Sequence, residues 1–435
     1  MERRFDPAGP LRGTLRPPAD KSISHRAALI GAMGEGETRI EGYLDAADTR
    51  STLAAMEAIG ATVEAGPTTR DSHPQSLDLR VEGVGLRGAS SAQIDVGNAG
   101  TLLRIVPGWL AGQKGKEWTL DGDASIRRRP VDRVAEPLRE MGAEVDCRDG
   151  RFPPLRVEGA ALTGIEYRLP VASAQVKSCV LLAGLLAEGE TTVVEPSPSR
   201  DHTERMLAAS GARLETAGGR ITIRPAERLQ SQRLEIPGDI SSAAFALLAA
   251  LLVAESEIEL ISVGLNPTRT GLLTILGRMG AQLEVGETAP AGHEPRGTVQ
   301  AVASRLAGTE VGGDEVPLAI DELPLVALAG CFAEGETVIR DAAELRQKES
   351  DRIAAVCEGL AALGGDVEAT DDGMIVRGGG GLRGGTLDAR GDHRLALLGA
   401  VAGLASAEGV TVRGFEAAKV SYPGFERDLS SLISR

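Results

Sequence analysis

Aromatic residues are scarce in this chain and make up only 3% of its 435 residues. Hydrophobic residues nevertheless reach 42% and charged residues 25%, and no long polar tract interrupts them. This balance is typical of a folded globular protein and excludes a disordered one. Because aromatic rings are few, the core must consist mainly of alanine, leucine and valine. A chain of this length is long for one core and fits two domains.

Long apolar runs are also missing. The longest one, Ala243 to Ala254, is shorter than the roughly 20 residues that a membrane-spanning helix needs. The first residues, Met1 to Asp6, lack the apolar stretch of a signal peptide. We therefore expect a cytoplasmic protein that does not associate with a membrane.

The chain also has fewer basic than acidic residues and shows no metal-binding pattern. The net charge of −15 argues against nucleic acid as a partner, because phosphate backbones bind to basic faces. The four cysteines form no Cys-x-x-Cys pair, and the five histidines show no metal-ligand spacing, so we expect no metal ion. Any anionic ligand must therefore meet a local positive site.

What the chain does have is a sixfold repeat. In each copy an Asn, Ser or Asp residue opens an apolar helix of about three turns, and a short strand follows. Successive openings are 68 to 80 residues apart, which indicates six copies of one supersecondary unit. The six openings are Ser22, Asn98, Ser173, Ser241, Asp321 and Asp392.

A second helix in each of the first five copies ends at a glycine, as in the phrase from Met56 to Glu64. The glycine predicts a left-handed C-terminal cap, and the alternating residues after it predict a strand. One unit then has the order strand, helix, strand, helix, strand, strand. Helices between strands favour crossovers, so we expect parallel-rich sheets wrapped with helices in an α/β fold.

The domain boundaries follow from an unpaired strand at Leu11 to Arg16. The sixth unit runs into the C-terminus before its last strand, so the N-terminal strand can complete the C-terminal half. We predict an N-terminal domain of three units over residues 20–234. The C-terminal domain then takes residues 1–19 and 235–435.

Cations cluster at several of the helix openings. A helix N-terminus carries partial positive charge, so Lys21 and Arg26 in the first unit cost stability unless an anion compensates. Arg394 repeats this pattern in the sixth unit, where Lys419 also precedes the second helix, and Arg129 ends a run of three arginines. The alternative for any single opening is a plain N-cap. The fourth unit, with Ser241 and Ser242, carries no charge and is interpreted as mainly structural.

The fifth unit carries carboxylates instead. Asp321 stands at its opening, and Lys348, Glu349 and Arg352 mix both signs before its second helix. Carboxylates near cations are suited to general acid–base chemistry. A plain N-cap role for Asp321 is the alternative.

Seven motifs, in order along the whole chain, closely resemble the 5-enolpyruvylshikimate-3-phosphate synthase family. They are Asp20–Arg26, Asn98–Thr101, Ser173–Gln175, Asp321–Pro324, Lys348–Arg352, Asp392–Arg394 and Lys419–Pro423. The resemblance implies transfer of the enolpyruvyl group of phosphoenolpyruvate to the 5-hydroxyl of shikimate 3-phosphate, with release of phosphate. It also implies two similar domains of the inside-out α/β barrel type that close over the substrates. No cofactor is expected, and we expect a monomer.

The resemblance also implies the site residues. Shikimate 3-phosphate would be bound by Lys21, Ser22, Arg26, Ser173, Gln175, Asp321 and Lys348. Phosphoenolpyruvate would be bound by Lys21, Gly100, Arg129, Gln175, Arg352, Arg394 and Lys419. The reaction adds the hydroxyl to the enolpyruvyl group and then eliminates phosphate. Asp321 would be the base for the hydroxyl, and Glu349 with Lys21 would serve the proton exchange at carbon and phosphate.

Two positions depart from, or distinguish, members of that family. Residues 199–203 differ from the Ser-Lys-Pro-Tyr version that many members carry. Gly100 is alanine in members tolerant to the herbicide glyphosate, so we hypothesise that an open position at Gly100 leaves room for this inhibitor.

Three rival functions are weighed against this one. The transferase acting on UDP-N-acetylglucosamine carries a reactive cysteine in a loop that here, at residues 122–130, has none. A non-catalytic repeat protein that binds anions would keep equivalent positions alike, whereas these openings differ. RNA-end cyclases are disfavoured by the acidic charge.

Overall fold

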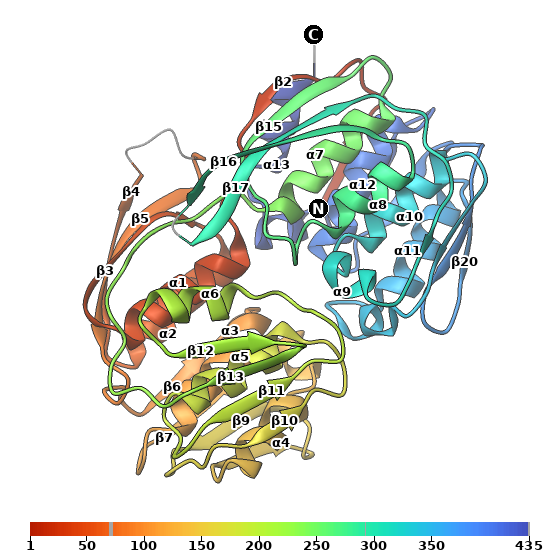
Figure 1. Cartoon of the computed structure of the whole chain (residues 1–435). Helices are drawn as coiled ribbons and strands as arrows, with labels where there is room; N and C mark the ends of the chain where they lie inside the picture. Colours follow the sequence, from red (N-terminus) through yellow and green to blue (C-terminus); the bar gives the residue numbers. More distant parts are fainter. Residues whose placement is uncertain (69–72, 292, 434–435) are drawn as a thin grey trace. The chain divides into compact units, whose positions relative to one another are not determined.

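The computed structural model describes residues 1–68, 73–291 and 293–433. The chain divides into two compact units (Figure 1). Unit 1 comprises Met1–Pro18, Pro237–Pro290 and Pro295–Arg435. Unit 2 comprises Ala19–Ile236 and Ala291–Glu294. Each unit has a buried apolar core of its own.

Unit 2 contains the first three repeats. The first consists of α1 (Lys21–Met33), β3 (Glu35–Leu44), α2 (Ala47–Ala58), β4 (Thr62–Pro67) and β5 (Ser76–Val84), with β14 (Arg233–Glu235) joining its sheet. The second consists of β6 (Ala92–Asp95), α3 (Gly100–Ala111), β7 (Glu117–Asp121), the 3-10 turn η1 (Ile126–Arg128), α4 (Asp132–Glu140), β8 (Glu144–Arg148) and β9 (Phe152–Glu158). The third consists of β10 (Glu166–Arg168), α5 (Ala174–Gly184), β11 (Thr191–Val194), α6 (His202–Ala209), β12 (Leu214–Ala217) and β13 (Arg220–Ile223).

Unit 1 contains the other three repeats. The fourth consists of α7 (Ile240–Leu252), β15 (Glu257–Gly264), α8 (Gly271–Arg278), β16 (Gln282–Ala291) and β17 (Glu294–Val302). The fifth consists of β18 (Glu310–Val311), α9 (Glu315–Ala319), α10 (Leu323–Phe332), β19 (Glu336–Ile339), η2 (Ala343–Gln347), α11 (Arg352–Ala362), β20 (Asp366–Ala369) and β21 (Met374–Arg377). The sixth consists of β22 (Gly385–Asp388), α12 (His393–Ala405), β23 (Val410–Arg413), η3 (Phe415–Val420) and α13 (Phe425–Leu432).

The predicted order of elements in a repeat is confirmed, but the prediction of parallel-rich sheets is wrong. In the second repeat only β6 and β7 pair in parallel, whereas β7 with β9 and β8 with β9 pair antiparallel. The third and fifth repeats have the same pattern. The reason is that the last two strands of a repeat are joined by a short turn, and a hairpin pairs antiparallel.

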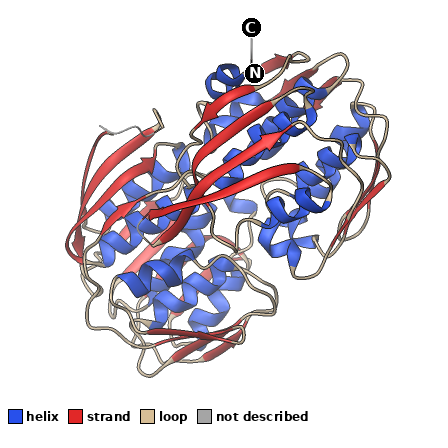
Figure 2. Ribbon diagram, turned by 45° about the horizontal axis from the view of Figure 1, so that its top comes forward, coloured by secondary structure: helices blue, strands red, loops and turns tan. Residues whose placement is uncertain are grey.

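Within each unit the helices lie inside and the sheets outside (Figure 2), which reverses the wrapping expected from the repeat order alone and agrees with the inside-out arrangement that the family resemblance implies. In unit 2, α1 and α5 both pack against α3. These helices are mostly apolar or small and bury nearly every side chain, including the charged side chains of Arg26, Arg104 and Lys177. Gly108 of α3 allows this close approach, since a Cβ there would overlap the backbone carbonyl oxygen of Cys179 in α5.

The glycine-capped second helices are confirmed. In the first repeat Gly60 has φ +108°, its N–H donates to Glu57, and the N–H of Ala61 donates to Met56. These two bonds are the Schellman pattern that satisfies the last carbonyls of a helix. The same left-handed glycine follows α4, α6, α8 and α11, at Gly142, Gly211, Gly280 and Gly364.

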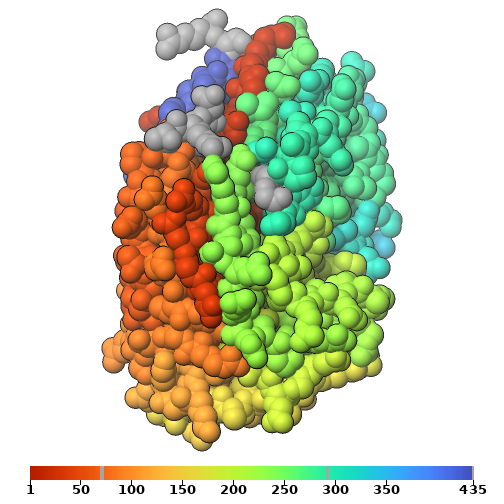
Figure 3. Space-filling model, turned by 60° about the vertical axis from the view of Figure 1, so that its left-hand side comes forward, coloured from red at the N-terminus to blue at the C-terminus, as the bar shows by residue number. Residues whose placement is uncertain are grey.

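Two N-terminal strands complete sheets of unit 1. The predicted strand is confirmed as β2 (Arg12–Leu15), which pairs in parallel with β15 of the fourth repeat. A further strand, β1 (Glu2–Phe5), was not predicted and pairs antiparallel with β23 of the sixth repeat. In unit 2, β14 likewise joins the sheet of an earlier repeat, and it pairs in parallel with β3. In Figure 3 the green segment lies along the red-orange one.

In the described part of the chain, no helix combines the length and apolar character needed to cross a bilayer. Within the same residues, no group of three His, Cys, Asp or Glu side chains could hold a metal ion. All four cysteines are free, and Cys179, Cys331 and Cys357 are buried. Burial raises the pKa of the Cys331 thiol to about 12, so this thiol stays protonated and unreactive.

Candidate active site

The start of α1 gathers three predicted residues of unit 2. Asp20, not Ser22, is the N-cap, because its carboxylate accepts from the N–H of Ile23. Lys21 lies in the first turn, and its Nζ is 3.1 Å from Oδ2 of the buried Asp48. That carboxylate compensates part of the positive charge that opposes the helix dipole.

Arg26 lies in the second turn of α1 and is buried. Its Nε donates to Thr203 Oγ1 at 2.7 Å, and its Nη2 donates to Ser178 Oγ at 3.1 Å. A third bond runs from Nη1 to the carbonyl of Ser22 at 3.0 Å. These bonds tie Arg26 to α5 and α6, and so to the segment 199–203 in which this chain departs from many members of the family it resembles.

Ser173 and Gln175 stand at the start of α5. Ser173 is the N-cap, as predicted, and accepts from the N–H of Val176 at 3.5 Å. The Gln175 amide bridges to α3: its Oε1 accepts from Arg104 at 3.0 Å, and its Nε2 donates to Thr101 at 3.3 Å. Sequence reasoning missed Arg104, although an arginine inside an apolar helix is a signal in itself.

Gly100 and Arg129 lie next to each other. Arg129 Nη2 donates to Asn98 Oδ1 and to Ser125 Oγ, both at 3.1 Å. Asn98 is not a helix cap, because its side chain is used here and the N-cap of α3 is Ala99. A Cβ at residue 100 would lie 2.5 Å from Nη1 of Arg129, so the guanidinium lies directly beside Gly100.

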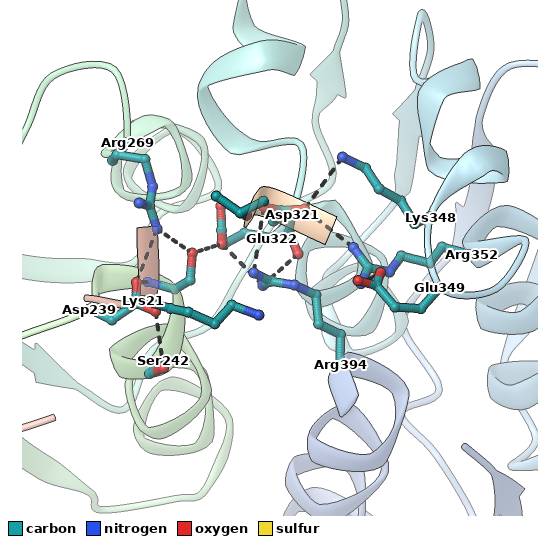
Figure 4. A network of polar contacts seen from close by, with 12 residues as sticks. Lys21, Asp239, Ser242, Arg269, Asp321, Glu322, Lys348, Glu349, Arg352 and Arg394 are labelled. Carbon is teal, nitrogen blue, oxygen red and sulfur yellow. Dashed lines mark hydrogen bonds and ion pairs between the residues drawn. The ribbon is translucent and has the colours of Figure 1, made fainter. Parts of the chain in front are cut away.

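Asp321 is the centre of a charged cluster in unit 1 (Figure 4). Its carboxylate lies 3.2 Å from Arg352 Nη1, 3.6 Å from Arg394 Nη2 and 3.7 Å from Lys348 Nζ. Asp321 is not an N-cap, because α10 begins at Leu323 after Glu322. The side chain faces these three cations.

Arg352 links three carboxylates. Its Nη2 donates to Glu349 at 2.6 Å and its Nε donates to Asp392 at 2.8 Å, in addition to the contact with Asp321. Burial raises the pKa of the Asp392 carboxyl, but the charge and hydrogen bond of Arg352 together with His393 hold that pKa below its usual value. Asp392 also caps α12, as predicted, by accepting from the N–H of Arg394. The cluster is thus held at the starts of α10, α11 and α12.

The fourth repeat is charged, which contradicts its interpretation as uncharged. Asp239, not Ser241, is the N-cap of α7, and it pairs with the buried Arg269 at 3.0 Å. Ser241 donates to Glu322 and accepts from Arg269. A signal was present in the sequence, because Arg269 precedes a second helix just as Arg129 and Lys419 do.

Lys419 lies exposed in η3 and is not part of the cluster around Asp321. Arg127 of the arginine run pairs with Asp121 at 2.7 Å, so that cation is matched within the protein. In the departing segment, the buried His202 places Nδ1 2.7 Å from Glu294 Oε1. The buried Lys177 of α5, which sequence reasoning missed, binds Glu195, Glu204 and the carbonyl of Ser199.

Comparison with known proteins first defines a class. The structure of the enolpyruvyl transferase NikO from Streptomyces tendae matches 99% of this chain and 96% of its own at a TM-score of 0.77, and at 19% identity it shows the shared fold. The predicted α/β fold of the enolpyruvyl transferases is therefore confirmed.

Closer similarities narrow the class. An EPSP synthase structure from Acinetobacter baumannii is 40% identical, with a TM-score of 0.85 over 99% of this chain and 98% of its own. The 3-phosphoshikimate 1-carboxyvinyltransferase of Synechococcus sp. (strain JA-3-3Ab) is 48% identical over 99% of this chain and 96% of that relative. That of Desulforudis audaxviator is 45% identical over 99% of both. The family model for EPSP synthase (3-phosphoshikimate 1-carboxyvinyltransferase) matches residues 5–429. The chain belongs to this family, and the resemblance inferred from its seven motifs is confirmed.

Proposed function

We propose that this protein transfers the enolpyruvyl group of phosphoenolpyruvate to the 5-hydroxyl of shikimate 3-phosphate and releases phosphate. The reaction is a step of the shikimate pathway, which leads to chorismate and aromatic amino acids. One observation in the structure carries the proposal: the Asp321 carboxylate lies within 4 Å of three cations, and Glu349 shares one of them. A base among cations suits a reaction between two anionic substrates.

The binding roles follow the family motifs. Shikimate 3-phosphate is bound by Lys21, Ser22, Arg26, Ser173, Gln175, Asp321 and Lys348. Phosphoenolpyruvate is bound by Lys21, Gly100, Arg129, Gln175, Arg352, Arg394 and Lys419. Both ligands carry phosphate and carboxylate groups, and guanidinium groups match such anions with paired hydrogen bonds.

The chemistry assigned to the side chains is addition followed by elimination. Asp321 takes the proton of the attacking hydroxyl, while a proton is delivered to the methylene carbon of phosphoenolpyruvate. In the elimination the bond between carbon and the phosphate oxygen breaks, and the methyl group loses a proton, which regenerates the double bond. Glu349 and Lys21 serve this proton exchange at carbon and the departure of phosphate. The Arg352 guanidinium donates to both Asp321 and Glu349, so one side chain holds the two carboxylates near each other.

Phosphate release from the two substrates tests the proposal. Wild-type protein is expected to turn over, and Asp321→Asn is expected to lose roughly a hundredfold to ten-thousandfold in kcat. Asp366 is an exposed residue of β20, and Asp366→Asn is the matched control, which is expected to keep full activity. Phosphate release with UDP-N-acetylglucosamine in place of shikimate 3-phosphate would favour the rival transferase. Unchanged phosphate release in Asp321→Asn and Glu349→Gln would contradict the assigned roles.

We further propose a cytoplasmic monomer with two folding domains, residues 20–234 and residues 1–19 with 235–435. Two separate apolar cores support the two-domain part. Sedimentation equilibrium tests the monomer, and a mass of twice 45.2 kDa would contradict it.

A further inference from the structure

A chain of hydrogen bonds connects the fourth repeat to the charged cluster at Asp321, all within unit 1 (Figure 4). At one end Arg269 pairs with Asp239 at 3.0 Å, and its Nη2 also donates to Ser241 Oγ at 2.7 Å. Ser241 in turn donates to Oε1 of Glu322. The Ser241 hydroxyl has one proton, so the bond that it accepts fixes the direction in which it donates.

Glu322 connects Ser241 to Arg394. Its Oε1 accepts from Arg394 Nη1 at 3.2 Å, and the same Nη1 donates to the backbone carbonyl of Asp321 at 2.9 Å. These two acceptors hold the guanidinium by its Nη1. Nη2 is then 3.6 Å from the Asp321 carboxylate, too far for a hydrogen bond, and remains able to bind an anion.

Burial makes this series of hydrogen bonds rigid. Arg269 and Ser241 are each 3% exposed, and Glu322 is 1% exposed. A buried carboxylate is costly unless it is bonded, and Glu322 is bonded at Oε1, by Ser241 and Arg394, while its Oε2 has no hydrogen-bond partner among the described residues. Without the Ser241 hydroxyl, Arg394 is the stronger remaining donor to Glu322, and we expect its guanidinium to move toward that carboxylate.

We propose that Ser241 and Arg269 are positioning residues for the enolpyruvyl transfer, which hold Glu322 and thereby orient Arg394 for phosphoenolpyruvate. This inference rests on the proposed function and assigns a role in the reaction to the fourth repeat. Neither residue touches substrate in this proposal, and both act through Glu322. The fourth repeat, to which no substrate-binding cation is assigned, thus sets the geometry of Arg394, a binding cation of the sixth repeat.

Ser241→Ala tests the inference, with Ser242→Ala as the matched control. Ser242 is the next residue of the same helix, but its hydroxyl bonds to Asp239 rather than to Glu322. For Ser241→Ala we expect the KM for phosphoenolpyruvate to rise about tenfold to a hundredfold, the loss expected for a bond to a charged group. The KM for shikimate 3-phosphate should change less than threefold, and Ser242→Ala should resemble wild type in both constants.

Glu322→Gln supplies a second measurement if Ser241→Ala fails to fold. It keeps the shape of the side chain and removes the charge that holds Arg394, so the same selective rise in KM is expected. Equal rises in both KM values, or a lower melting temperature with wild-type kinetics, would indicate a merely structural role and overturn the inference. An active wild type with unchanged Ser241→Ala and Glu322→Gln kinetics overturns the inference alone. An inactive wild type overturns the proposed function and this inference with it.

Discussion

His25 is a neutral base buried beside two cations. Burial lowers its pKa from 6.5 to about 3, and the charges of Lys21 and Arg26 act in the same direction. Its Nδ1 lies 2.6 Å from Thr52 Oγ1, while its Nε2 has no hydrogen-bond partner among the described residues. A proton on this ring would therefore meet two like charges close by.

The first prediction concerns the pH dependence of stability. Below pH 6.5 the unfolded chain protonates His25 while the folded chain does not, so the free energy of unfolding falls as the pH drops from about 6.5 toward 3. The full effect is up to about 5 kcal/mol. Urea unfolding of wild type and His25→Gln at pH 7.5 and pH 5 measures it. The variant should lose less stability between the two pH values, and an identical loss would contradict the prediction.

Gly100→Ala is predicted to weaken phosphoenolpyruvate binding. The new methyl group would lie 2.5 Å from Arg129 Nη1, so the guanidinium must move. We expect a rise in KM for phosphoenolpyruvate of about fivefold or more, and weaker inhibition by glyphosate if the inhibitor uses the same cation. Steady-state kinetics measure both. Gly277→Ala in α8 is the control, because a Cβ there meets nothing within 4 Å. Unchanged constants in Gly100→Ala would show that Arg129 yields without consequence.

Within unit 1, the structure brings several of the site residues that were named from the sequence into one cluster. Asp321, Lys348, Arg352 and Arg394 form one cluster, and their motifs predicted it. Arg104 and Arg269 escaped sequence reasoning because each is bonded to a partner distant in sequence, Gln175 or Ser241. A local motif does not encode such pairs.

At the scale of single elements, helix starts were the least predictable feature. Asp20 and Asp239 cap α1 and α7 two residues before the expected Ser22 and Ser241. All four residues are good caps on propensity alone. The choice depends on tertiary contacts, since Ser241 is engaged by Arg269 and Glu322. The glycine caps of the second helices were predictable because the left-handed conformation is a local requirement.

The core helix α5 depends on a buried ion cluster. Lys177 Nζ lies 2.9 Å from Glu195 and 2.7 Å from Glu204, and all three side chains are less than 10% exposed. Burial raises the pKa of the Glu204 carboxyl despite the nearby ammonium, so the charged form of Glu204 depends on Lys177.

Lys177→Met is predicted to destabilise the protein by about 3–5 kcal/mol, because two buried carboxylates lose their shared cation. Denaturant unfolding at pH 7.5 measures the loss. Lys114→Met, at an exposed position, is the control and should stay within about 0.5 kcal/mol of wild type. Equal stability of the two variants would contradict the prediction. The Glu195→Gln, Glu204→Gln double change should restore part of the stability of Lys177→Met, because it removes the unpaired charges.

At the scale of the whole molecule, periodicity predicted the number and order of elements but not their layering. The repeat phrases gave six units, and six sheets are present among the described residues. The repeat order alone predicts helices outside the sheets, because crossover helices usually cover a sheet. Helices that are apolar all round, such as α7, belong inside instead, as in the inside-out arrangement that the family resemblance implies. Strand β1 was missed because its sequence, Glu-Arg-Arg-Phe, has one apolar residue and depends on β23 for its pairing.

The last prediction concerns β1, which anchors the sixth repeat. Phe5 is buried, and its ring centroid lies 5.0 Å from that of Phe415. Glycine makes room for it, because a Cβ at Gly403 would lie 2.6 Å from the Cβ of Phe5. The strand also supplies all the antiparallel partners of β23. Its loss should therefore expose one edge of the sheet and open a cavity beside α12.

Deletion of residues 1–6 is accordingly expected to cost about 3–5 kcal/mol, the scale of removing a buried phenylalanine. Hydrogen exchange should rise at Val410–Arg413 while β7 and β9 in unit 2 keep their protection, because those strands pair only within their own sheet. Arg3→Ala is the control, since it removes an exposed side chain of β1 and leaves the backbone pairing intact. If the deletion left exchange at Val410–Arg413 unchanged, the sixth sheet would not need β1. If it raised exchange equally in both units, the cores of the two units would not unfold separately.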